Sequence, residues 1–170
     1  MLKKIKINKV VLQNRIFVGP MCQYSADSGK PSKWHYEHLG RLAELGAGLL
    51  MIESTAVSKS GRISKKDLQL TNHSQQKSFS KLLKNLKKKG GTKIGIQISH
   101  SGRKGSAEIP WIKYNTPLKK NQGSWKTLAP SSIKRDKKWP KPKEMSYKDL
   151  KSVLNEFKNT ATKAKKIGFD

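Results

Sequence analysis

The run Gly48-Leu49-Leu50-Met51-Ile52-Glu53 is apolar over four consecutive positions and closes on a carboxylate. A strand without alternation of apolar and polar residues is typical of a parallel sheet, because both faces of such a sheet are covered. A shorter apolar run, Ile16-Phe17-Val18, precedes Gly19-Pro20, and residues 93–99 alternate Ile with Gly, Gln and Ser. We therefore predict buried strands at 16–20, 48–53 and 93–99, each leading into a loop.

Two amphipathic helices are predicted between these strands. Ser32 can cap a helix that runs to about Gly46. The apolar residues on its predicted buried side are Trp34, Leu39, Leu42 and Ala43. Ser74 can cap a second helix, which Gly90-Gly91 ends. Its apolar residues follow helical spacing and are Phe79, Leu82, Leu83 and Leu86.

A long loop and a last helix follow the third strand. Residues 100–145 hold most of the prolines and show no periodicity, and ordered loops of that length are usually functional. Ser146-Tyr147-Lys148-Asp149 resembles a capping box, with Asp in place of Glu or Gln. The predicted helix ends near Gly168, a candidate C-cap. Its apolar face comprises Leu150, Val153, Leu154, Phe157, Ala161 and Ala164.

The order β–α–β–α–β–long loop–α predicts the α/β class, with a parallel sheet covered by helices. No glycine-rich phosphate-binding motif follows a strand, which argues against dinucleotide-binding and P-loop folds. A (β/α)8 TIM barrel remains, but it typically needs about 250 residues and eight units, and the chain supplies about three. We expect one incomplete, N-terminal barrel part over residues 1–170. Its parts are a hairpin around Asn8-Lys9 within 1–15, three strands with two helices at 16–99, the long loop at 100–145 and a helix at 146–167.

The charge of the chain suggests an alternative function. The sequence has 37 Lys and Arg against 11 Asp and Glu, a net charge of +26 and a mean hydropathy of -0.73. Such a balance is typical of a basic, non-enzymatic nucleic-acid-binding protein. The cations are mostly Lys and lie along the whole chain, whereas Arg is the residue that reads bases. The composition therefore favours a solvated basic surface without a specific nucleic-acid partner.

Cysteine content and hydropathy exclude further classes. One Cys excludes a disulfide within the chain and Cys-based zinc or iron–sulfur sites. No apolar run approaches the roughly 20 residues that span a bilayer. The N-terminus has charge but no apolar signal region, so we expect a cytoplasmic protein without a membrane partner.

Chemistry in barrel enzymes sits at the C-terminal ends of the strands. The segments there are Pro20-Met21-Cys22-Gln23-Tyr24-Ser25, Glu53-Ser54-Thr55-Ala56-Val57 and His100-Ser101-Gly102-Arg103-Lys104. The chain also contains, in order, Asn14-Arg15-Ile16, Trp34-His35-Tyr36 and Gly61-Arg62-Ile63. Together these segments resemble the Old Yellow Enzyme family of FMN-dependent NADH:flavin oxidoreductases, most closely the bacterial branch with Cys beside the flavin.

The resemblance implies FMN as the cofactor, NAD(P)H as the reductant and an electrophilic alkene or quinone-like molecule as the substrate. Hydride would pass from NAD(P)H through flavin N5 to an activated C=C. In this family the residues at Gly19, Pro20 and Met21 lie along the flavin ring, and Cys22 sits near N5 and tunes the ring. The resemblance further implies that the Ala56 N–H meets the O4/N5 edge and that Gln97 pairs with O2/N3. Tyr24 would donate a hydrogen bond to the carbonyl of the substrate.

Without the resemblance, each of these residues could have a purely structural role. Cys22 could be a small buried apolar residue, Tyr24 a core or rim tyrosine with a satisfied hydroxyl, and Gln97 a hydrogen-bonded polar residue in the core. His100 and Arg103 look like an acid–base pair, but pinning the start of the long loop is the preferred interpretation. His35 and His38 lack a third ligand at suitable spacing, so helix packing is favoured and no metal site is predicted. Glu53 ends a buried strand and should have a fixed partner.

Other parts of the family pattern would lie beyond Asp170. They are a His pair or His and Asn after a fourth strand, a proton-donating Tyr, an Arg near flavin N1/O2, and the loops that hold the FMN phosphate. We therefore expect the 170-residue chain to be inactive alone. A truncated reading frame, an incomplete sequence and one partner of a split enzyme all fit, the last completed by a separately encoded half or by a homo-oligomer.

Overall fold

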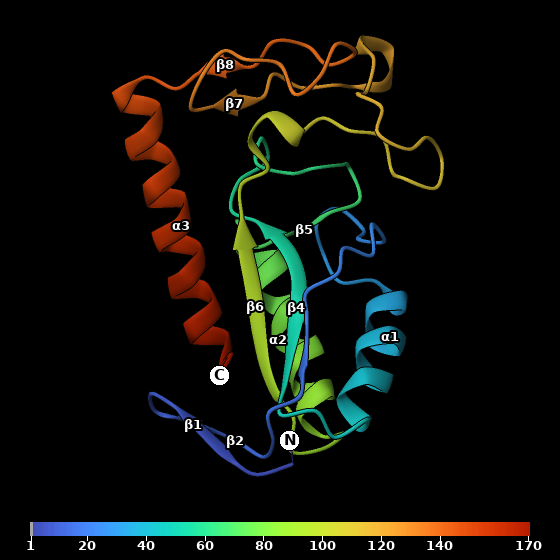
Figure 1. Cartoon of the computed structure of the whole chain (residues 1–170), viewed down its shortest axis with the longest axis vertical. Helices are drawn as coiled ribbons and strands as arrows, with labels where there is room; N and C mark the ends of the chain where they lie inside the picture. The colour runs from blue at the N-terminus through green and yellow to red at the C-terminus, as the bar shows by residue number, and fades with distance from the viewer. Residues whose placement is uncertain (1) are drawn as a thin grey trace.

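A parallel sheet lies at the centre of the computed structural model, which describes residues 2–170 (Figure 1). Its strands are β3 (Phe17–Val18), β4 (Leu49–Ala56), β5 (Leu68–Gln69) and β6 (Lys93–Ser99). β4 pairs in parallel with each of the other three, and the predicted strand at 93–99 is confirmed. β4 extends beyond the predicted 48–53 to Ala56, because Thr55 and Ala56 pair both with β6 and with β5, a two-residue strand that we did not predict.

The first strand is shorter and more exposed than expected. The predicted buried strand at 16–20 is limited to Phe17–Val18, and the Phe17 side chain is 48% exposed. β3 forms the edge of the described sheet and meets only β4, so its other side lacks a neighbour that would cover it. The prediction of a buried strand at 16–20 was therefore wrong, because the structure has a short, partly exposed edge strand there.

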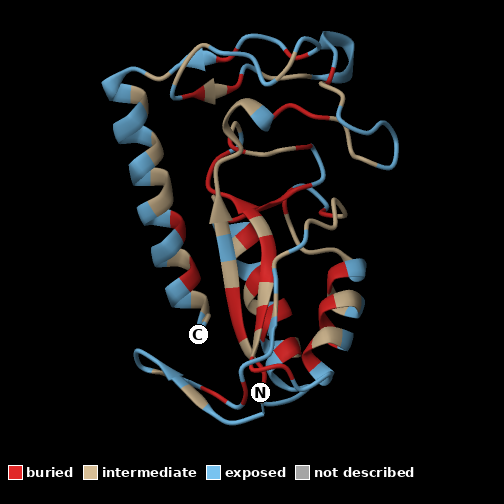
Figure 2. Ribbon diagram, viewed as in Figure 1, coloured by how far each residue is buried: buried red, intermediate tan, exposed pale blue. Residues whose placement is uncertain are grey.

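Helices α1 (Lys33–Glu44) and α2 (His73–Lys87) pack on one face of the sheet (Figure 1). The buried apolar residues gather between that face and the helices (Figure 2). This core contains Leu39, Ala43, Leu50, Ile52, Leu68, Leu70, Phe79, Leu82, Leu83, Leu86 and Ile94. The predicted apolar face of α2 is thus confirmed in full.

Two predictions on the helices need correction. Ser32 caps α1 as predicted, but α2 begins after Asn72, whose Oδ1 accepts the Gln75 N–H at 2.9 Å, and not after Ser74. Trp34 does not face the core: it is 48% exposed and stacks on His38 with ring centroids 5.7 Å apart. Trp34 lies on the first turn of α1, where its indole N–H reaches out to Gln23 Oε1 at 3.0 Å.

Helix α3 (Tyr147–Ile167) stands beside β6 and is anchored at its C-terminal end. Both predicted caps are present, with Ser146 Oγ accepting the Asp149 N–H at 3.2 Å and Gly168 at φ 97°. Thr160 Oγ1 donates to the Leu70 carbonyl at 3.3 Å, and Ala164 joins the core.

The rest of the predicted apolar face of α3 is largely uncovered. Leu150 and Leu154 are 49% and 54% exposed, and only Ala164 of that face is buried (Figure 2). The cause is geometric, since the N-terminal half of the helix extends away from the sheet (Figure 1). Phe169 and Asp170 follow the helix back to β6, where the Asp170 N–H donates to the Ile94 carbonyl at 3.1 Å.

The predicted hairpin is formed by β1 (Ile5–Ile7) and β2 (Val10–Leu12), antiparallel and joined through Asn8 at φ 53°. It is tied to the sheet by Asn14, whose Nδ2 donates to the Gly46 carbonyl at 2.7 Å. Asn14 Oδ1 accepts the Ile16 N–H at 3.0 Å. The backbone passes so close at this point that a Cβ on Gly48 would collide with the Asn14 carbonyl oxygen.

The long loop lies over the C-terminal ends of β4 and β6 (Figure 1). It contains the 3-10 turns η1 (Gly102–Lys104) and η2 (Lys120–Gln122) and a small parallel pair, β7 (Leu128–Ala129) with β8 (Lys143–Glu144). Arg103 Nη2 donates to Ser131 Oγ at 2.9 Å, and His100 Nδ1 accepts the Gly102 N–H at 3.2 Å. Both residues therefore pin the loop, as the preferred interpretation predicted.

Candidate functional site at the strand ends

The face of the sheet opposite α1 and α2 carries the candidate site. Leu50 and Ile52 of β4 point into the helix-covered core, so Leu49 and Met51 lie on the other face. A Cβ on Gly95 would collide with the Met51 sulfur, which places Gly95 on this second face. Gln97 and Ser99 share the face with Gly95, because side chains alternate along a strand. Ser99 hydrogen-bonds Ser54 of β4 through its hydroxyl.

Cys22 lies in the loop that follows β3. The backbone of Ser54 and the hydroxyl of Tyr24 lie near its thiol and act to lower its pKa. Burial, the nearby Asp67 carboxylate and then Glu53 raise the pKa of the thiol to about 11. Cys22 is thus a neutral thiol at physiological pH.

Tyr24 stands next to Cys22 in a left-handed backbone conformation, at φ 45°. Its ring meets Trp111 edge-on, with centroids 5.6 Å apart, and it lines a hollow of about 190 Å³ together with Ile63 and Tyr114. Burial and the thiol of Cys22 raise the pKa of Tyr24 to about 12. The hydroxyl therefore remains a hydrogen-bond donor at any physiological pH.

Ala56 is buried at the end of β4, where its backbone takes part in the hydrogen bonding of the sheet. The Ala56 carbonyl accepts the Leu70 N–H at 3.2 Å on the side of β5. In a strand the N–H and carbonyl of one residue point to the same side, so the Ala56 N–H also faces β5, with Gln69 as its pairing residue. Donation of this N–H to a ligand on the sheet face would require the pairing with β5 to open.

Gly19, Pro20 and Met21 bring the chain from β3 to Cys22 along the rim of the sheet. Gly19 is exposed and no atom lies within 4 Å of a Cβ built on it, so the rim is open there. The Met21 side chain is 61% exposed. Gln97 is also exposed, and its amide has no hydrogen bond to another residue within 2–170. The rim therefore presents an apolar side chain and a free amide on an open surface.

A buried pair behind the site fixes the ends of β4 and α1. His35 Nδ1 accepts the Ser32 N–H at 3.0 Å, so the ring proton of neutral His35 is on Nε2. That nitrogen lies 3.5 Å from Glu53 Oε2, and both side chains are buried. Glu53 Oε1 accepts the Gln23 N–H at 3.1 Å. Glu53 thus has the fixed partners that the sequence predicted without naming them, and His35 serves helix packing.

Asp67 is the residue near the site that sequence reasoning missed. It is buried, and its carboxylate accepts the Ile63 N–H at 2.6 Å and the Ser64 hydroxyl at 2.7 Å. Burial raises its pKa to about 6, against the opposing effect of these hydrogen bonds. Its charge acts on both Cys22 and Tyr24. No spacing in the sequence singles out this carboxylate, since it belongs to an irregular loop.

No group of three or more His, Cys, Asp or Glu among residues 2–170 could hold a metal ion. None of the helices described is both long and apolar enough to cross a membrane.

Parallel strands with helices on one face and polar residues at their C-terminal ends define part of an α/β barrel enzyme fold. The chain belongs to the NADH:flavin oxidoreductase / NADH oxidase family, whose family model matches residues 1–170. It is 38% identical to an NADH:flavin oxidoreductase of Gibberella zeae over 169 residues, 98% of this chain and 41% of the relative. It is 38% identical to an NADPH dehydrogenase of Listeria monocytogenes over 167 residues, 97% of this chain and 44% of the relative.

Solved structures confirm the predicted fold class. Old Yellow Enzyme from a Pichia species superposes with a TM-score of 0.83 at 23% identity, covering 99% of this chain and 44% of that one. Morphinone reductase superposes with a TM-score of 0.81 at 19% identity, covering 99% and 46%. The chain thus spans less than half the length of the relatives it matches. None of these relatives supports the nucleic-acid-binding alternative.

Proposed function

We propose that this chain supplies the flavin-facing part of an FMN-dependent NAD(P)H oxidoreductase that reduces an electron-poor alkene or a quinone-like molecule. FMN, when bound, would take hydride from NAD(P)H and deliver it to an activated C=C. The observation that supports the proposal is that β3 and β6 both pair in parallel with β4, so the loop that carries Cys22 and the strand end that carries Gln97 lie toward one edge of the sheet. Membership of the family supports it.

The chemistry of the rim fits an isoalloxazine ring. The Gln97 amide offers one acceptor and two donors and is free of other partners within residues 2–170, which suits the alternating O2/N3 edge. Cys22 would meet the ring as a neutral thiol and so would not oppose negative charge on it. The exposed Met21 would cover part of the apolar ring. Ala56 fits less well, because its N–H is directed at β5.

Tyr24 would orient the substrate. Its hydroxyl stays protonated, so it can donate to a carbonyl that activates the C=C. Such a donor withdraws electron density from the alkene and stabilises charge that develops on the carbonyl oxygen. Trp111 packs against the ring edge and restricts where the hydroxyl can point.

The residues described here would hold only the ring of FMN. Recognition of a phosphate depends on charge-assisted hydrogen bonds, which supply much of the affinity for such a cofactor. The resemblance places those contacts, and the His that holds the substrate, beyond residue 170. We expect the purified 170-residue chain to be colourless and to oxidise NAD(P)H no faster than the background.

A chimera tests the proposal directly. Residues 1–170 would be joined to the part of the Listeria monocytogenes NADPH dehydrogenase that lies beyond the matched region. The folded chimera should bind one FMN and oxidise NADPH in the presence of an electron-poor alkene. Gln97→Ala should weaken FMN binding by roughly tenfold, as expected for the loss of one or two hydrogen bonds. Lys59→Ala, at an exposed site near the same strand ends, should leave binding unchanged.

The outcomes separate the two parts of the proposal. A chimera that folds by circular dichroism but binds no FMN would refute the assigned function. One FMN bound to the isolated chain, with turnover that Gln97→Ala abolishes, would refute the expectation that the chain is inactive alone. Tyr24→Phe in the chimera should lower turnover and leave FMN affinity unchanged, and an equal loss of both would contradict a substrate-orienting role.

A further inference from the structure

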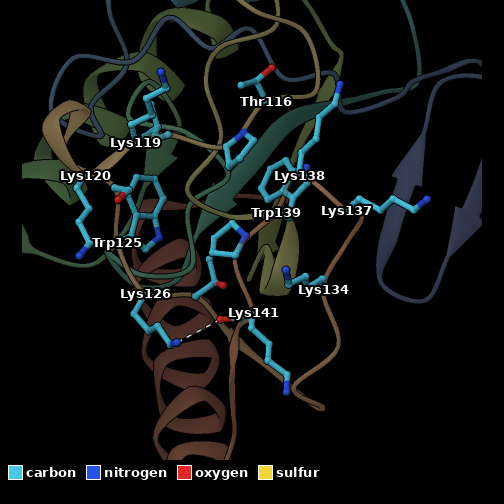
Figure 3. A pocket seen from close by; sticks show the side chains of 15 residues that line it. Thr116, Lys119, Lys120, Trp125, Lys126, Lys134, Lys137, Lys138, Trp139 and Lys141 are labelled. Atoms are coloured by element: carbon cyan, nitrogen blue, oxygen red, sulfur yellow. Dashed lines mark hydrogen bonds between the residues drawn. The ribbon is translucent and has the colours of Figure 1, made fainter.

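A second hollow lies within the long loop, in a part of the chain that the proposed chemistry does not use. Its volume is about 810 Å³, and residues 116–141 of the chain contribute its whole lining. That volume falls within the range of about 300–1,000 Å³ that is usual for small-molecule sites. Figure 3 shows Trp125 and Trp139 at its centre and lysine side chains spread around it.

The floor of the hollow is apolar and held in place. Trp139 is 2% exposed, and the guanidinium of Arg135 lies 4.7 Å from the centre of its ring. Trp125 is half-buried; its indole N–H donates to the Ser60 carbonyl at 3.0 Å, and Arg62 lies over the ring at 4.7 Å. Both indoles are therefore fixed before a ligand arrives, which lowers the entropy lost on binding.

The rim of the hollow is strongly cationic. Residues 116–141 contain seven lysines and one arginine but a single carboxylate, Asp136. The lining includes all seven lysines and no acidic residue. Asp136 is already engaged, since its two oxygens accept from the Lys138 N–H at 2.8 Å and from Asn115 Nδ2 at 3.4 Å. A ligand in the hollow would meet seven lysines, whose positive charge the single carboxylate of Asp136 offsets only in small part.

We propose that this hollow binds a nucleoside phosphate. An aromatic base would pack on the half-buried indole of Trp125 and on the prolines of the lining, and the phosphates would meet lysines of the rim. Inorganic phosphate alone would leave the apolar floor exposed to water, so no apolar surface would be buried on binding. An uncharged aromatic molecule would form no charge-assisted hydrogen bonds with the lysines. Lys126 Nζ already donates to the Lys141 carbonyl at 3.2 Å, which holds one ammonium group at the mouth.

The same chemistry has two sources in a cell: a free nucleotide and the adenosine end of NAD(P)H. Titration calorimetry on the purified 170-residue chain would use ADP, NADPH, adenosine and inorganic phosphate. We expect saturable binding of ADP, with adenosine and phosphate each at least about tenfold weaker. NADPH binding that matches ADP assigns the site to the reductant, and ADP binding without NADPH binding assigns it to free nucleotides.

Matched variants locate the site. Replacing Lys126, Lys134 and Lys141 by Gln should weaken ADP binding by about tenfold, because each ion pair between a solvated lysine and a phosphate adds only modestly to the affinity. Replacing Lys3, Lys4 and Lys6 by Gln removes the same charge at the opposite end of the molecule and should change affinity less than twofold. Equal losses in the two variants, phosphate binding as tight as ADP binding, or no saturable binding would each overturn the proposal. A single-stranded oligonucleotide bound a hundredfold more tightly than ADP would also overturn it, in favour of nucleic acid.

Discussion

The thiol of Cys22 should react far more slowly in the folded chain than in the unfolded chain. Burial and the carboxylates of Asp67 and Glu53 raise its pKa from 9.0 to about 11. Thiolate is the reactive form, and at pH 8 its fraction falls from about one tenth to about one thousandth when the pKa rises from 9 to 11. The folded chain therefore holds about a hundredfold less thiolate at this pH.

A second effect opposes part of this loss. A thiolate of higher pKa is intrinsically more nucleophilic, with a Brønsted coefficient of about 0.4–0.5, so two pKa units return a factor of roughly eight. The net expectation is a reaction about tenfold slower at pH 8 in the folded state. Partial burial of Cys22 slows it further by restricting access.

The assay is the reaction with an aromatic disulfide reagent across pH 7 to 10.5, in buffer and in guanidinium chloride. The sequence contains one cysteine, so the released chromophore reports on Cys22 alone. The rate in buffer should still be rising at pH 10, whereas the rate in denaturant should level off above pH 9. A folded-state rate at pH 8 equal to that of the unfolded chain, or an apparent pKa of 9 or below, would refute the described surroundings of the thiol.

Three further predictions concern stability and pH. Phe79→Ala should lower the free energy of unfolding by about 3–5 kcal/mol, since the ring is fully buried in the core, whereas Phe17→Ala at the exposed edge should cost far less in the same denaturant titration. Ser146→Ala should cost about 1 kcal/mol through loss of the α3 cap and reduce helical circular dichroism; no loss of either signal would contradict the capping geometry. Asp67 has a pKa raised to about 6, so its contribution to stability is present below about pH 4 and is lost as pH rises through 6. Asp67→Asn should flatten stability over that interval, and an unchanged pH profile would argue against a buried carboxylate.

The strands and caps could be predicted because their signals are local. An apolar run identified β4, the alternation of Ile with Gly, Gln and Ser identified β6, and a hydroxyl before a helical pattern identified the caps at Ser32 and Ser146. Asn72 was missed although Gln75 follows it at capping-box spacing, a signal that outweighs the nearer Ser74. β5 could not be found, because two residues carry no periodicity.

Tertiary context decided the remaining differences. The pattern of α3 predicts an apolar face correctly, but it does not say which part of that face another element covers, and Leu150 and Leu154 stay exposed. Within the site, the sequence placed Cys22 after the first strand and Gln97 near the end of the third, and the parallel pairing of β3 and β6 with β4 agrees with that order. The contact between Glu53 and His35 joins a strand to a helix, and the influence of Asp67 arises from a loop. Neither leaves a repeat or a spacing from which it could be deduced.

The close approach at Gly48 limits how this sequence can drift. A Cβ at position 48 would meet the backbone oxygen of Asn14. No substitution at position 14 can remove that atom. Loss of the Asn14 side chain would not make room either, because the oxygen belongs to the main chain. In a randomised library selected for folding, position 48 should retain glycine alone, while position 14 should accept other residues at a cost in stability. At the junction between hairpin and sheet, position 48 therefore tolerates no residue other than glycine while this backbone is kept.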